Sequence, residues 1–256
     1  MLQADQIVCG YGKNIVLDKL SFRVEEGKVL CILGANGIGK TTLFKSILGH
    51  IRLIGGTISV HQRNIATLSY KEKAKEIAYV PQAHIPAFPF QVIDVVAMGR
   101  TAHLSVISSP SGKDLRIADE ALKLLNIYEL RDKAYTQISG GERQLVLIAR
   151  ALTQETKLII MDEPTANLDF GNQTRIIEQM NHLAKQGHSI LYTTHDPEHA
   201  FLCSNQVMAI RGKGDVLVGD AKEIITNELL SEIYHVNALV KEVELPERTI
   251  RVCIPV

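Results

Sequence analysis

Apolar residues along this chain follow two main patterns, continuous runs and runs with helical spacing. Continuous runs predict buried strands of a parallel sheet at KVLCILG (28–34), KLIIM (157–161) and HSILYTT (188–194). Apolar residues at spacings of three and four predict helices over 40–50, 92–100, 114–127, the stretch after Gly141, and 175–187. Strands that alternate with helices in this way are typical of an α/β fold, whose functional groups collect at the carboxyl ends of the strands.

Strand-like and helical segments are unevenly distributed along the chain. Short strand-like pieces occur at 6–12, 21–27 and 55–62, whereas 91–152 is helical in character. We therefore expect a single domain, 1–256, in which about 91–152 is a helical insertion into an α/β core formed by about 1–90 and 153–256. In the last part of the chain we expect strands within 206–219, one helix over 221–234 and a strand-like tail.

Composition limits the functions that this pattern can serve. The chain has 256 residues, 46% of them hydrophobic, and its 28 basic and 28 acidic residues give a formal net charge of zero. This balance gives no global electrostatic reason to expect nucleic acid as a partner, so any phosphate site must be local. No apolar run approaches the roughly 18 residues of a membrane span, and the N-terminal residues do not have the pattern of a secretion signal. The four cysteines are scattered without metal-binding spacing, and we expect reduced, mostly buried thiols.

The segment GANGIGKTT (34–42) matches the phosphate-binding pattern G-x-x-x-x-G-K-[ST] between a predicted buried strand and a predicted helix. Glycines there allow backbone N–H groups to surround phosphate oxygens. Lys40 would reach the β- and γ-phosphates, and the Thr41 hydroxyl would ligate Mg²⁺. The alternative is a chance glycine turn, which the flanking strand and helix disfavour. Alone, the segment indicates only a nucleoside triphosphate.

Polar residues follow three other predicted strands. Asp162 and Glu163 end one run, where the aspartate suits Mg²⁺ and the glutamate suits activation of a water for attack on the γ-phosphate. His195 ends another run and could bond the γ-phosphate as a neutral donor, and the side-chain oxygen of Gln82, after AYVP, could complete the Mg²⁺ shell. Tyr11, between two glycines, could stack on adenine. Each has a plainer alternative: solvated carboxylates, a structural histidine, a loop glutamine and a packed loop tyrosine.

The phrase ISGGERQ (138–144) combines a helix start with two poor helix formers. Ser139 and Glu142 have the spacing of a capping box, which predicts a helix N-terminus. Gly140 and Gly141 each cost a helix roughly 1 kcal/mol relative to alanine, so helix stability does not explain them. We interpret them as exposing the backbone at a helix N-terminus, where an anion can bind.

In their order and context these motifs resemble the ATP-binding cassette family over nearly the whole chain. The segments that the family calls A-loop, P-loop, Q-loop, signature, Asp-Glu strand, D-loop and H-loop are matched by Tyr11, 34–42, Gln82, ISGGERQ, LIIMDEP (158–164), ANLD (166–169) and His195. The resemblance implies a P-loop NTPase core with a parallel sheet, an antiparallel β subdomain and an inserted α-helical subdomain that carries the signature. ISGGERQ departs from the common LSGGQ at Ile138 and Glu142, and the second change places a carboxylate near an anion site.

The resemblance also implies ligands and their contacts. The cofactors are ATP and Mg²⁺, with Glu163, His195 and Gln82 as catalytic residues and Thr41, Gln82 and Asp162 as Mg²⁺ ligands. The implied nucleotide-binding residues are Tyr11, Val16, Gly34, Asn36, Gly37, Gly39, Lys40, Thr41, Thr42, Ser139, Gly140, Gly141, Glu142 and Asp169.

One chain has two helix N-termini suited to phosphate, near Gly39 and near Gly140, but only one P-loop. If both termini are to touch one ATP, a second copy of the chain is needed, and a two-fold arrangement completes both sites. We therefore expect a homodimer that holds two ATP molecules between its chains, as in the family. Asp169 would help to join the two sites.

A single cassette without a membrane span resembles the ATPase subunit of a bacterial transporter whose permease is a separate chain. Segments 63–82, 92–100 and 219–236 are similar to those of importers for iron siderophores, haem, cobalamin and metal oxyanions such as molybdate. This resemblance implies a permease dimer as partner, bound near the helical segment that begins at Gln91. It also implies a periplasmic substrate-binding protein as an indirect partner, and a location at the cytoplasmic face of the inner membrane.

The alternative from another class is a soluble cassette ATPase of DNA repair or translation. Neutral net charge and the lack of a basic stripe make this the weaker hypothesis. An adenylate-type kinase or a GTPase is weaker still, because neither explains the signature.

Overall fold

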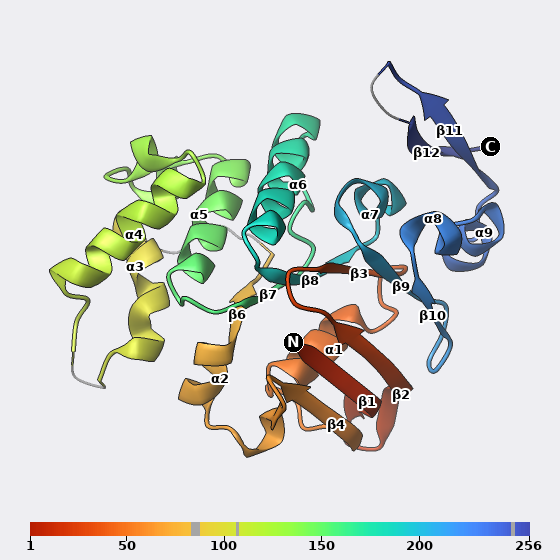
Figure 1. Cartoon of the computed structure of the whole chain (residues 1–256), viewed down its shortest axis with the longest axis horizontal. Coiled ribbons are helices and arrows are strands. Elements are labelled where there is room, and N and C mark those ends of the chain that lie inside the picture. Colours follow the sequence, from red (N-terminus) through yellow and green to blue (C-terminus); the bar gives the residue numbers. More distant parts are fainter. Residues whose placement is uncertain (83–87, 106–107, 247–248) are drawn as a thin grey trace. The chain divides into compact units, whose positions relative to one another are not determined.

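The computed structural model describes residues 1–82, 88–105, 108–246 and 249–256 (Figure 1). The chain divides into two compact units. The terminal unit comprises Met1–Thr67 and Leu183–Val256, and the central unit comprises Leu68–His182. Within the described ranges, every helix is too short or too polar to cross a bilayer.

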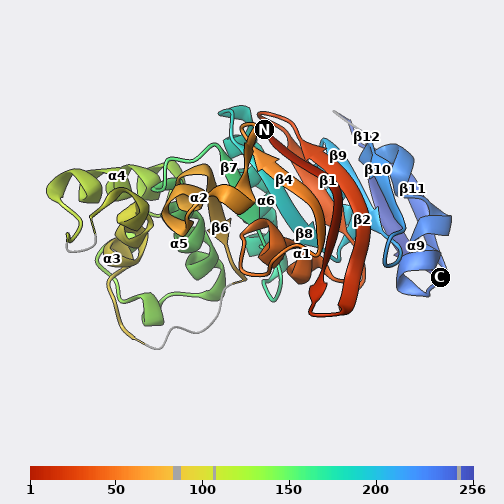
Figure 2. The same ribbon diagram turned by 90° about the horizontal axis from the view of Figure 1, so that it is seen from below.

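An antiparallel sheet forms the first part of the terminal unit (Figure 2). Its strands, in sheet order, are β2 (Asn14–Val24), β1 (Leu2–Tyr11), β4 (Gly55–Val60) and β5 (Arg63–Asn64). The register pairs Leu2 with Val24 on one side and with Val60 on the other. All three side chains are buried, so this face of the sheet contributes to the core of the unit. Helix α1 (Lys40–Ile47) packs against β1.

A second group of strands in the terminal unit leads to two of the predicted motifs. These strands are β3 (Val29–Leu33), β8 (Ser189–Thr194), β9 (Gln206–Ile210) and β10 (Val216–Gly219). β3 is parallel to β8 and to β9, whereas β10 is antiparallel to β9. Every residue of β3 and of β8 is buried, as is usual for parallel strands covered on both faces.

The central unit contains the parallel pair β6 (Ile77–Val80) and β7 (Leu158–Met161). Its α-helices are α2 (Tyr70–Glu76), α3 (Val92–Ala97), α4 (Gly112–Leu124), α5 (Gly140–Leu152) and most of α6 (Phe170–Lys185). Short 3₁₀ segments cover Ile65–Thr67 at the end of the terminal unit's first part and, in the central unit, Met98–His103, Tyr128–Leu130 and Tyr135–Gln137. Helices α3, α4 and α5 pack on one another, and they lie within the stretch expected to be helical. The expected α/β class, with parallel strands, antiparallel strands and helices, is confirmed.

The last part of the terminal unit differs from the prediction at two places, one unexpected helix and one helix that is divided into two. α7 (Pro197–Cys203) was not expected, although Asp196 caps it by accepting a hydrogen bond from Glu198 N. The single helix expected over 221–234 is two helices, α8 (Ala221–Ile224) and α9 (Asn227–Tyr234). The break follows from capping chemistry, because the Thr226 hydroxyl accepts a hydrogen bond from Leu229 N and starts a new helix there.

Two strands, β11 (Ala238–Glu244) and β12 (Thr249–Pro255), form an antiparallel pair after α9. They correspond to the expected strand-like tail. Cys253 N donates a hydrogen bond of 3.0 Å to Glu198 Oε1, which ties β12 to α7. Like Cys9, Cys31 and Cys203, Cys253 is a free thiol.

Candidate functional site

The phosphate-binding segment follows directly from β3 in the terminal unit. Gly37 and Gly39 have φ values of 81° and 115°, a backbone conformation that residues with a Cβ adopt only with strain. The two glycines turn the chain from the buried strand into α1, which begins at Lys40. A sharp turn with bare backbone between strand and helix is the geometry that the sequence pattern requires.

The N-terminus of α1 is suited to an anion. Gly39 has no side chain with which to cap the helix, and Lys40, Thr41 and Thr42 add no carboxylate to the first turn. Its backbone N–H groups and the positive end of the helix dipole are therefore oriented toward any phosphate in the loop. The Thr41 side chain is exposed at this point, where its hydroxyl can reach a ligand.

Lys40 is held at the same loop. Its side chain is 5% exposed, and Nζ donates hydrogen bonds to the carbonyl oxygens of Gly34 at 2.7 Å and Ala35 at 3.2 Å. These bonds keep the ammonium group against the loop that would surround the phosphates. A cation in this position can exchange carbonyl acceptors for the stronger charge-assisted bonds to phosphate oxygens.

Tyr11 and Val16 flank the turn between β1 and β2. Tyr11 is 51% exposed, which leaves part of the residue accessible to a planar ligand such as adenine. Val16 lies against the phosphate-binding segment, because a Cβ on Gly39 would be only 2.8 Å from Val16 Cγ1. Glycine at position 39 is thus required both by its φ and by the side chain of β2 that packs on it.

His195 and the phosphate-binding segment leave neighbouring strands at the same end. β3 and β8 are parallel, with Leu33 paired to Thr194, so Gly34 and His195 each follow directly on a paired residue. The His195 side chain is exposed there. Burial lowers the pKa of His199, one turn further on, although the charge of Asp196 acts in the opposite direction. The structure therefore brings together the P-loop and His195 in the terminal unit.

Gln82, Asp162 and Glu163 follow the two parallel strands of the central unit. Val80 pairs with Met161, and Asp162 N donates a 3.0 Å hydrogen bond to Val80 O. Asp162 is 9% exposed, whereas Gln82 is exposed. Glu163 has a φ of 44° without being glycine, a conformation that costs of order 1–3 kcal/mol and that clusters at functional sites.

Tyr79 contacts Asp162, a feature that the sequence analysis missed. Tyr79 pairs with Ile160, so the alternation of side chains puts Tyr79 and Asp162 on the same side of the two strands. Burial, together with the charge of the Asp162 carboxylate and the hydrogen bond to it, raises the pKa of Tyr79 to about 12. The tyrosine stays protonated and donates to the carboxylate. Alternation along β6 places Tyr79 on one face of its strand, but the register with β7 that brings it to Asp162 could not be derived from the sequence.

The signature segment forms the capping box that its spacing predicts. Ser139 Oγ accepts a hydrogen bond from Glu142 N at 3.2 Å, and Glu142 Oε2 accepts one from Ser139 N at 2.7 Å. The bond from the Ser139 backbone is the largest cause that lowers the pKa of Glu142. One carboxylate oxygen of Glu142 is thus used within its own helix. Contact between Glu142 and nucleotide stays a prediction.

The two glycines of the signature have different surroundings. A Cβ on Gly140 would meet only Leu168 Cδ2, at an ordinary contact distance of 3.6 Å. A Cβ on Gly141 would lie 2.2 Å from Cγ and from Oδ1 of Asn172. Packing therefore requires glycine at 141, whereas position 140 has room for a side chain. Asn172 also donates two hydrogen bonds to Asp169, the bond from its backbone N being the first cause that lowers the pKa of Asp169.

The predicted site residues are divided between the two units. The terminal unit contributes Tyr11, Val16, Gly34, Asn36, Gly37, Gly39, Lys40, Thr41, Thr42 and His195. The central unit contributes Gln82, Ser139, Gly140, Gly141, Glu142, Asp162, Glu163 and Asp169. In the parts of the chain that are described, groups of three or more His, Cys, Asp or Glu able to hold a metal ion are absent. The hydroxyl, amide and carboxylate oxygens of Thr41, Gln82 and Asp162 are of the type that Mg²⁺ takes beside nucleotide phosphates.

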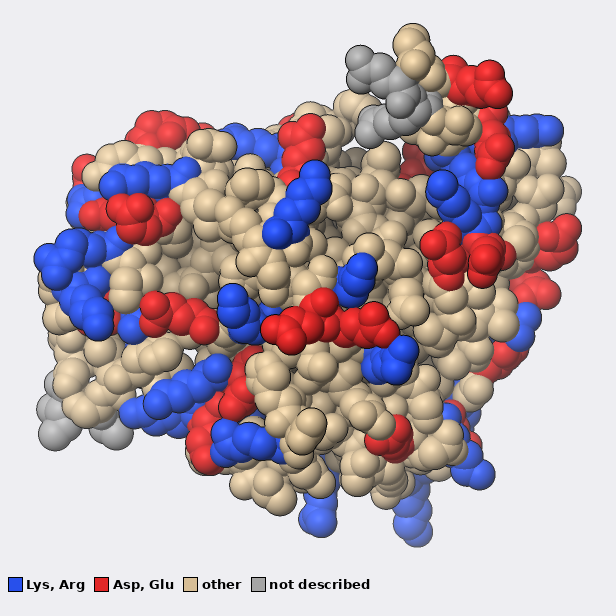
Figure 3. Space-filling view, viewed as in Figure 1, with Lys and Arg blue, Asp and Glu red and all other residues tan. Residues whose placement is uncertain are grey.

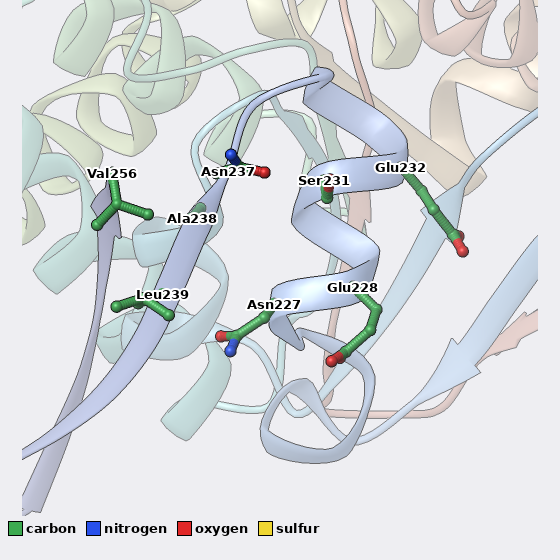
Figure 4. A pocket seen from close by; sticks show the side chains of 8 residues that line it. All are labelled: Asn227, Glu228, Ser231, Glu232, Asn237, Ala238, Leu239 and Val256. Carbon is green, nitrogen blue, oxygen red and sulfur yellow. The ribbon is translucent and has the colours of Figure 1, made fainter.

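Two surface features lie outside these motifs. On the face shown in Figure 3, basic and acidic side chains are interspersed, in keeping with the zero net charge. An open groove of about 490 Å³ in the terminal unit lies between α9 and β11, and Figure 4 shows Glu228 and Glu232 on one side of it and Leu239 on the other. Its lining residues, Asn227, Glu228, Ser231, Glu232, Asn237, Ala238, Leu239 and Val256, belong to none of the predicted motifs.

Comparison with known proteins gives matches along the whole chain. The family model described as ABC transporter matches residues 17–166. An ABC transporter ATP-binding protein of Haemophilus influenzae is 42% identical over 91% of this chain and 89% of its own length. The molybdate import ATP-binding protein MolC of the same species is 34% identical over 92% of this chain and 88% of its own. Among solved structures, an inward-facing conformation of a metal-chelate type ABC transporter aligns with a TM-score of 0.89 and 32% identity, over 100% of this chain and 97% of that one.

Proposed function

The chain belongs to the ABC transporter family, whose ATP-binding subunits hydrolyse ATP to power transport, and from this premise we propose that it energises import of a metal-containing substrate. The observation that carries the ATPase part of the proposal is the phosphate-binding loop between β3 and the uncapped N-terminus of α1, with Lys40 Nζ bonded to its carbonyl oxygens. A relative named as a molybdate import ATP-binding protein, and a structure of a metal-chelate type transporter, support the substrate class. The substrate is thus a metal chelate, a metal-containing cofactor or a metal oxyanion.

The chain's own residues divide the work of hydrolysis. Tyr11 stacks on the adenine, while backbone N–H groups of the P-loop and Lys40 bind the phosphates. Glu163 accepts a proton from the attacking water, and His195 and Gln82 orient the water and the γ-phosphate. Thr41, Gln82 and Asp162 would hold Mg²⁺, which would neutralise charge on the phosphate oxygens.

Two copies of the chain act together in this proposal. α1 and α5 each present a helix N-terminus preceded by glycine or serine, but the chain has one P-loop. In a two-fold dimer the signature of one chain faces the nucleotide held by the P-loop of the other, and Asp169 lies between the sites. The dimer closes on ATP and reopens after hydrolysis.

The partners follow from the transporter family. ATP-binding subunits of ABC importers work with membrane permease components, and one aligned structure is part of a transporter complex. We propose that two copies bind a permease dimer at the cytoplasmic face of the inner membrane and that a periplasmic substrate-binding protein delivers the cargo. The helical segment that begins at Gln91 is the proposed contact. The relatives named here are transporter subunits, so the repair or translation alternative gains no support from them.

A Glu163→Gln variant tests the ATPase and dimer parts of the proposal. It should bind ATP and sediment as a dimer with ATP and Mg²⁺, while turnover falls by about 10²–10⁴-fold, as on loss of a general base. A variant that stays monomeric at saturating ATP would show that the proposed dimer is wrong.

The import part needs a cellular readout. Cells that carry only the Glu163→Gln variant should lose content of one metal, such as iron, molybdenum or cobalt, in elemental analysis. A tagged wild-type chain purified from detergent-solubilised membranes should recover the permease. Recovery of an exporter permease, or unchanged content of every metal, would contradict the proposal.

A further inference from the structure

Asn172, in the first turn of α6, binds both carboxylate oxygens of Asp169. Its backbone N donates to Asp169 Oδ1 at 2.9 Å, and its side-chain Nδ2 donates to Asp169 Oδ2 at 2.6 Å. A carboxylate that accepts two such bonds from one residue has little freedom to rotate. The position of the D-loop aspartate is therefore set by Asn172.

The same side chain lies against the signature helix. An added Cβ on Gly141 would be 2.2 Å from Asn172 Cγ and Oδ1, and 2.8 Å from Asn172 Cβ. Real Cβ atoms do not approach other heavy atoms so closely, so the Asn172 side chain occupies the space that a side chain at 141 would need. Asn172 is half-buried between Asp169 on one side and the backbone of Gly141 on the other.

We propose that Asn172 is a positioning residue that ties the D-loop (166–169) to the signature helix α5 within one chain. The inference rests on the proposed dimer, in which both segments meet the partner chain's nucleotide. A close-packed contact transmits small displacements, because α5 cannot move toward Asn172 without displacing its side chain. When α5 shifts on nucleotide, Asn172 must shift with it and carry Asp169 along. The two segments then engage the nucleotide as one body.

The choice of glycine at 141 follows from this tie. Gly140, which has room for a side chain, remains available to the nucleotide, whereas Gly141 is bare because Asn172 packs on it. The signature therefore combines one glycine for the ligand with one for an internal contact.

The first test measures ATP-driven dimerisation by sedimentation in the Glu163→Gln background. Asn172→Ala should raise the ATP concentration at half-dimerisation at least about fivefold, the lower end of usual coupling between sites. Nucleotide affinity of the monomer at the P-loop should not change. Thr174→Ala is the matched control, since Thr174 lies on the same helix and its hydroxyl donates to Phe170 O at 2.9 Å; its midpoint should equal that of the parent.

The outcomes separate the two proposals. If the parent dimerises and Asn172→Ala dimerises at the same ATP concentration, Asn172 has no positioning role. If the parent itself never dimerises, the proposed dimer is wrong and this inference falls with it. Asn172→Asp keeps the shape of the side chain but faces Asp169 with a second carboxylate. It should raise the ATP concentration at half-dimerisation at least as much as Asn172→Ala does.

The second test is rescue of a substitution at 141. Gly141→Ala should slow ATP turnover at least about tenfold, equivalent to ~1.4 kcal/mol of barrier, because its Cβ displaces Asn172. Adding Asn172→Ala leaves the 2.8 Å Cβ–Cβ approach and should rescue little, whereas adding Asn172→Gly removes all three close atoms. The Gly141→Ala/Asn172→Gly variant should regain the turnover of Asn172→Gly alone. Failure to regain it, with thermal unfolding showing a folded protein, would mean that Gly141 is needed for a reason other than Asn172.

Discussion

The N-termini of α1 and α5 differ in what binds their first backbone N–H groups. Each has glycine at the helix start, Gly39 before α1 and Gly140 and Gly141 in the first turn of α5, and the sequence predicts an anion site at both. At α1 the turn glycine Gly39 has a φ of 115° and no capping side chain, so the helix donors are left to a ligand. At α5, Ser139 and Glu142 form a capping box that satisfies two donors inside the helix.

The charges at the two termini are also opposite. α1 begins with the buried cation Lys40 held at the loop, whereas α5 has the carboxylate of Glu142 in its first turn. A triphosphate therefore finds its main binding energy at α1. The signature helix is built to be rigid and to approach, rather than to hold, the nucleotide. The presence of glycines in the sequence does not by itself distinguish these two kinds of helix N-terminus.

Removal of the cation should give the largest effect. Lys40→Ala should weaken ATP binding about 100-fold, ~2.7 kcal/mol, because charge-assisted bonds to phosphate are lost. Equilibrium titration with a fluorescent ATP analogue measures it. Lys45→Ala, an exposed lysine later in the same helix, serves as the control and should bind like the wild type. Equal affinities for Lys40→Ala and Lys45→Ala would remove the main difference between the two termini.

Substitution of Gly39, the turn glycine before α1, should give the next largest effect. Gly39→Ala should lower the free energy of unfolding by about 2 kcal/mol, because a Cβ meets Val16 at 2.8 Å and the φ of 115° is strained for alanine. Urea denaturation measures the loss. Gly12→Ala is the matched comparison, with a positive φ of 58° but no atom within 4 Å, and should cost only about 1 kcal/mol. A smaller loss at Gly39 than at Gly12 would contradict the packing argument.

Gly140→Ala separates stability from function at α5. The added Cβ has room, so the free energy of unfolding should be unchanged or rise by up to about 1 kcal/mol through helix propensity. ATP turnover should nevertheless fall about tenfold, ~1.4 kcal/mol, because the side chain obstructs the approach of the helix to phosphate. Gly112→Ala is the control, since Gly112 also follows a serine N-cap at the first position of a helix, α4. It should share the stability change and leave turnover unaltered; a normal rate for Gly140→Ala would show that residue 140 stays away from nucleotide.

The smallest effect concerns the capping carboxylate. The pKa of Glu142 is lowered in the folded protein. Its carboxylate therefore stabilises the folded state above the ordinary glutamate pKa of about 4.3, and this stabilisation is lost as pH falls through the folded pKa. Glu142→Gln should lower the free energy of unfolding by about a few tenths of a kcal/mol at neutral pH. This difference in stability between the variant and the wild type should vanish on acidification. Thermal unfolding at a series of pH values measures it, with Glu72→Gln in the equivalent box of α2 as control. A difference that grows at low pH would have the wrong sign.

Much of the fold and site could be predicted because the signals were local. The apolar runs at β3, β7 and β8, the P-loop between strand and helix, and the Ser139–Glu142 box all depend on residues close together in sequence. The missed helix α7 also had a local signal, with an aspartate cap before Pro197, and so did the break between α8 and α9 at Thr226. Helix α2, which begins with the Ser69–Glu72 capping box, was missed for the same reason, overlooked capping chemistry.

The sequence by itself determined where the chain turns, which runs are buried and where phosphate can bind. These properties follow from side-chain periodicity, glycine backbone freedom and capping within a few residues. Only the tertiary structure decided that Tyr79 donates to Asp162 and that Asn172 occupies the space beside Gly141. Such contacts depend on strand register and on close packing between elements distant in sequence, which no local pattern specifies.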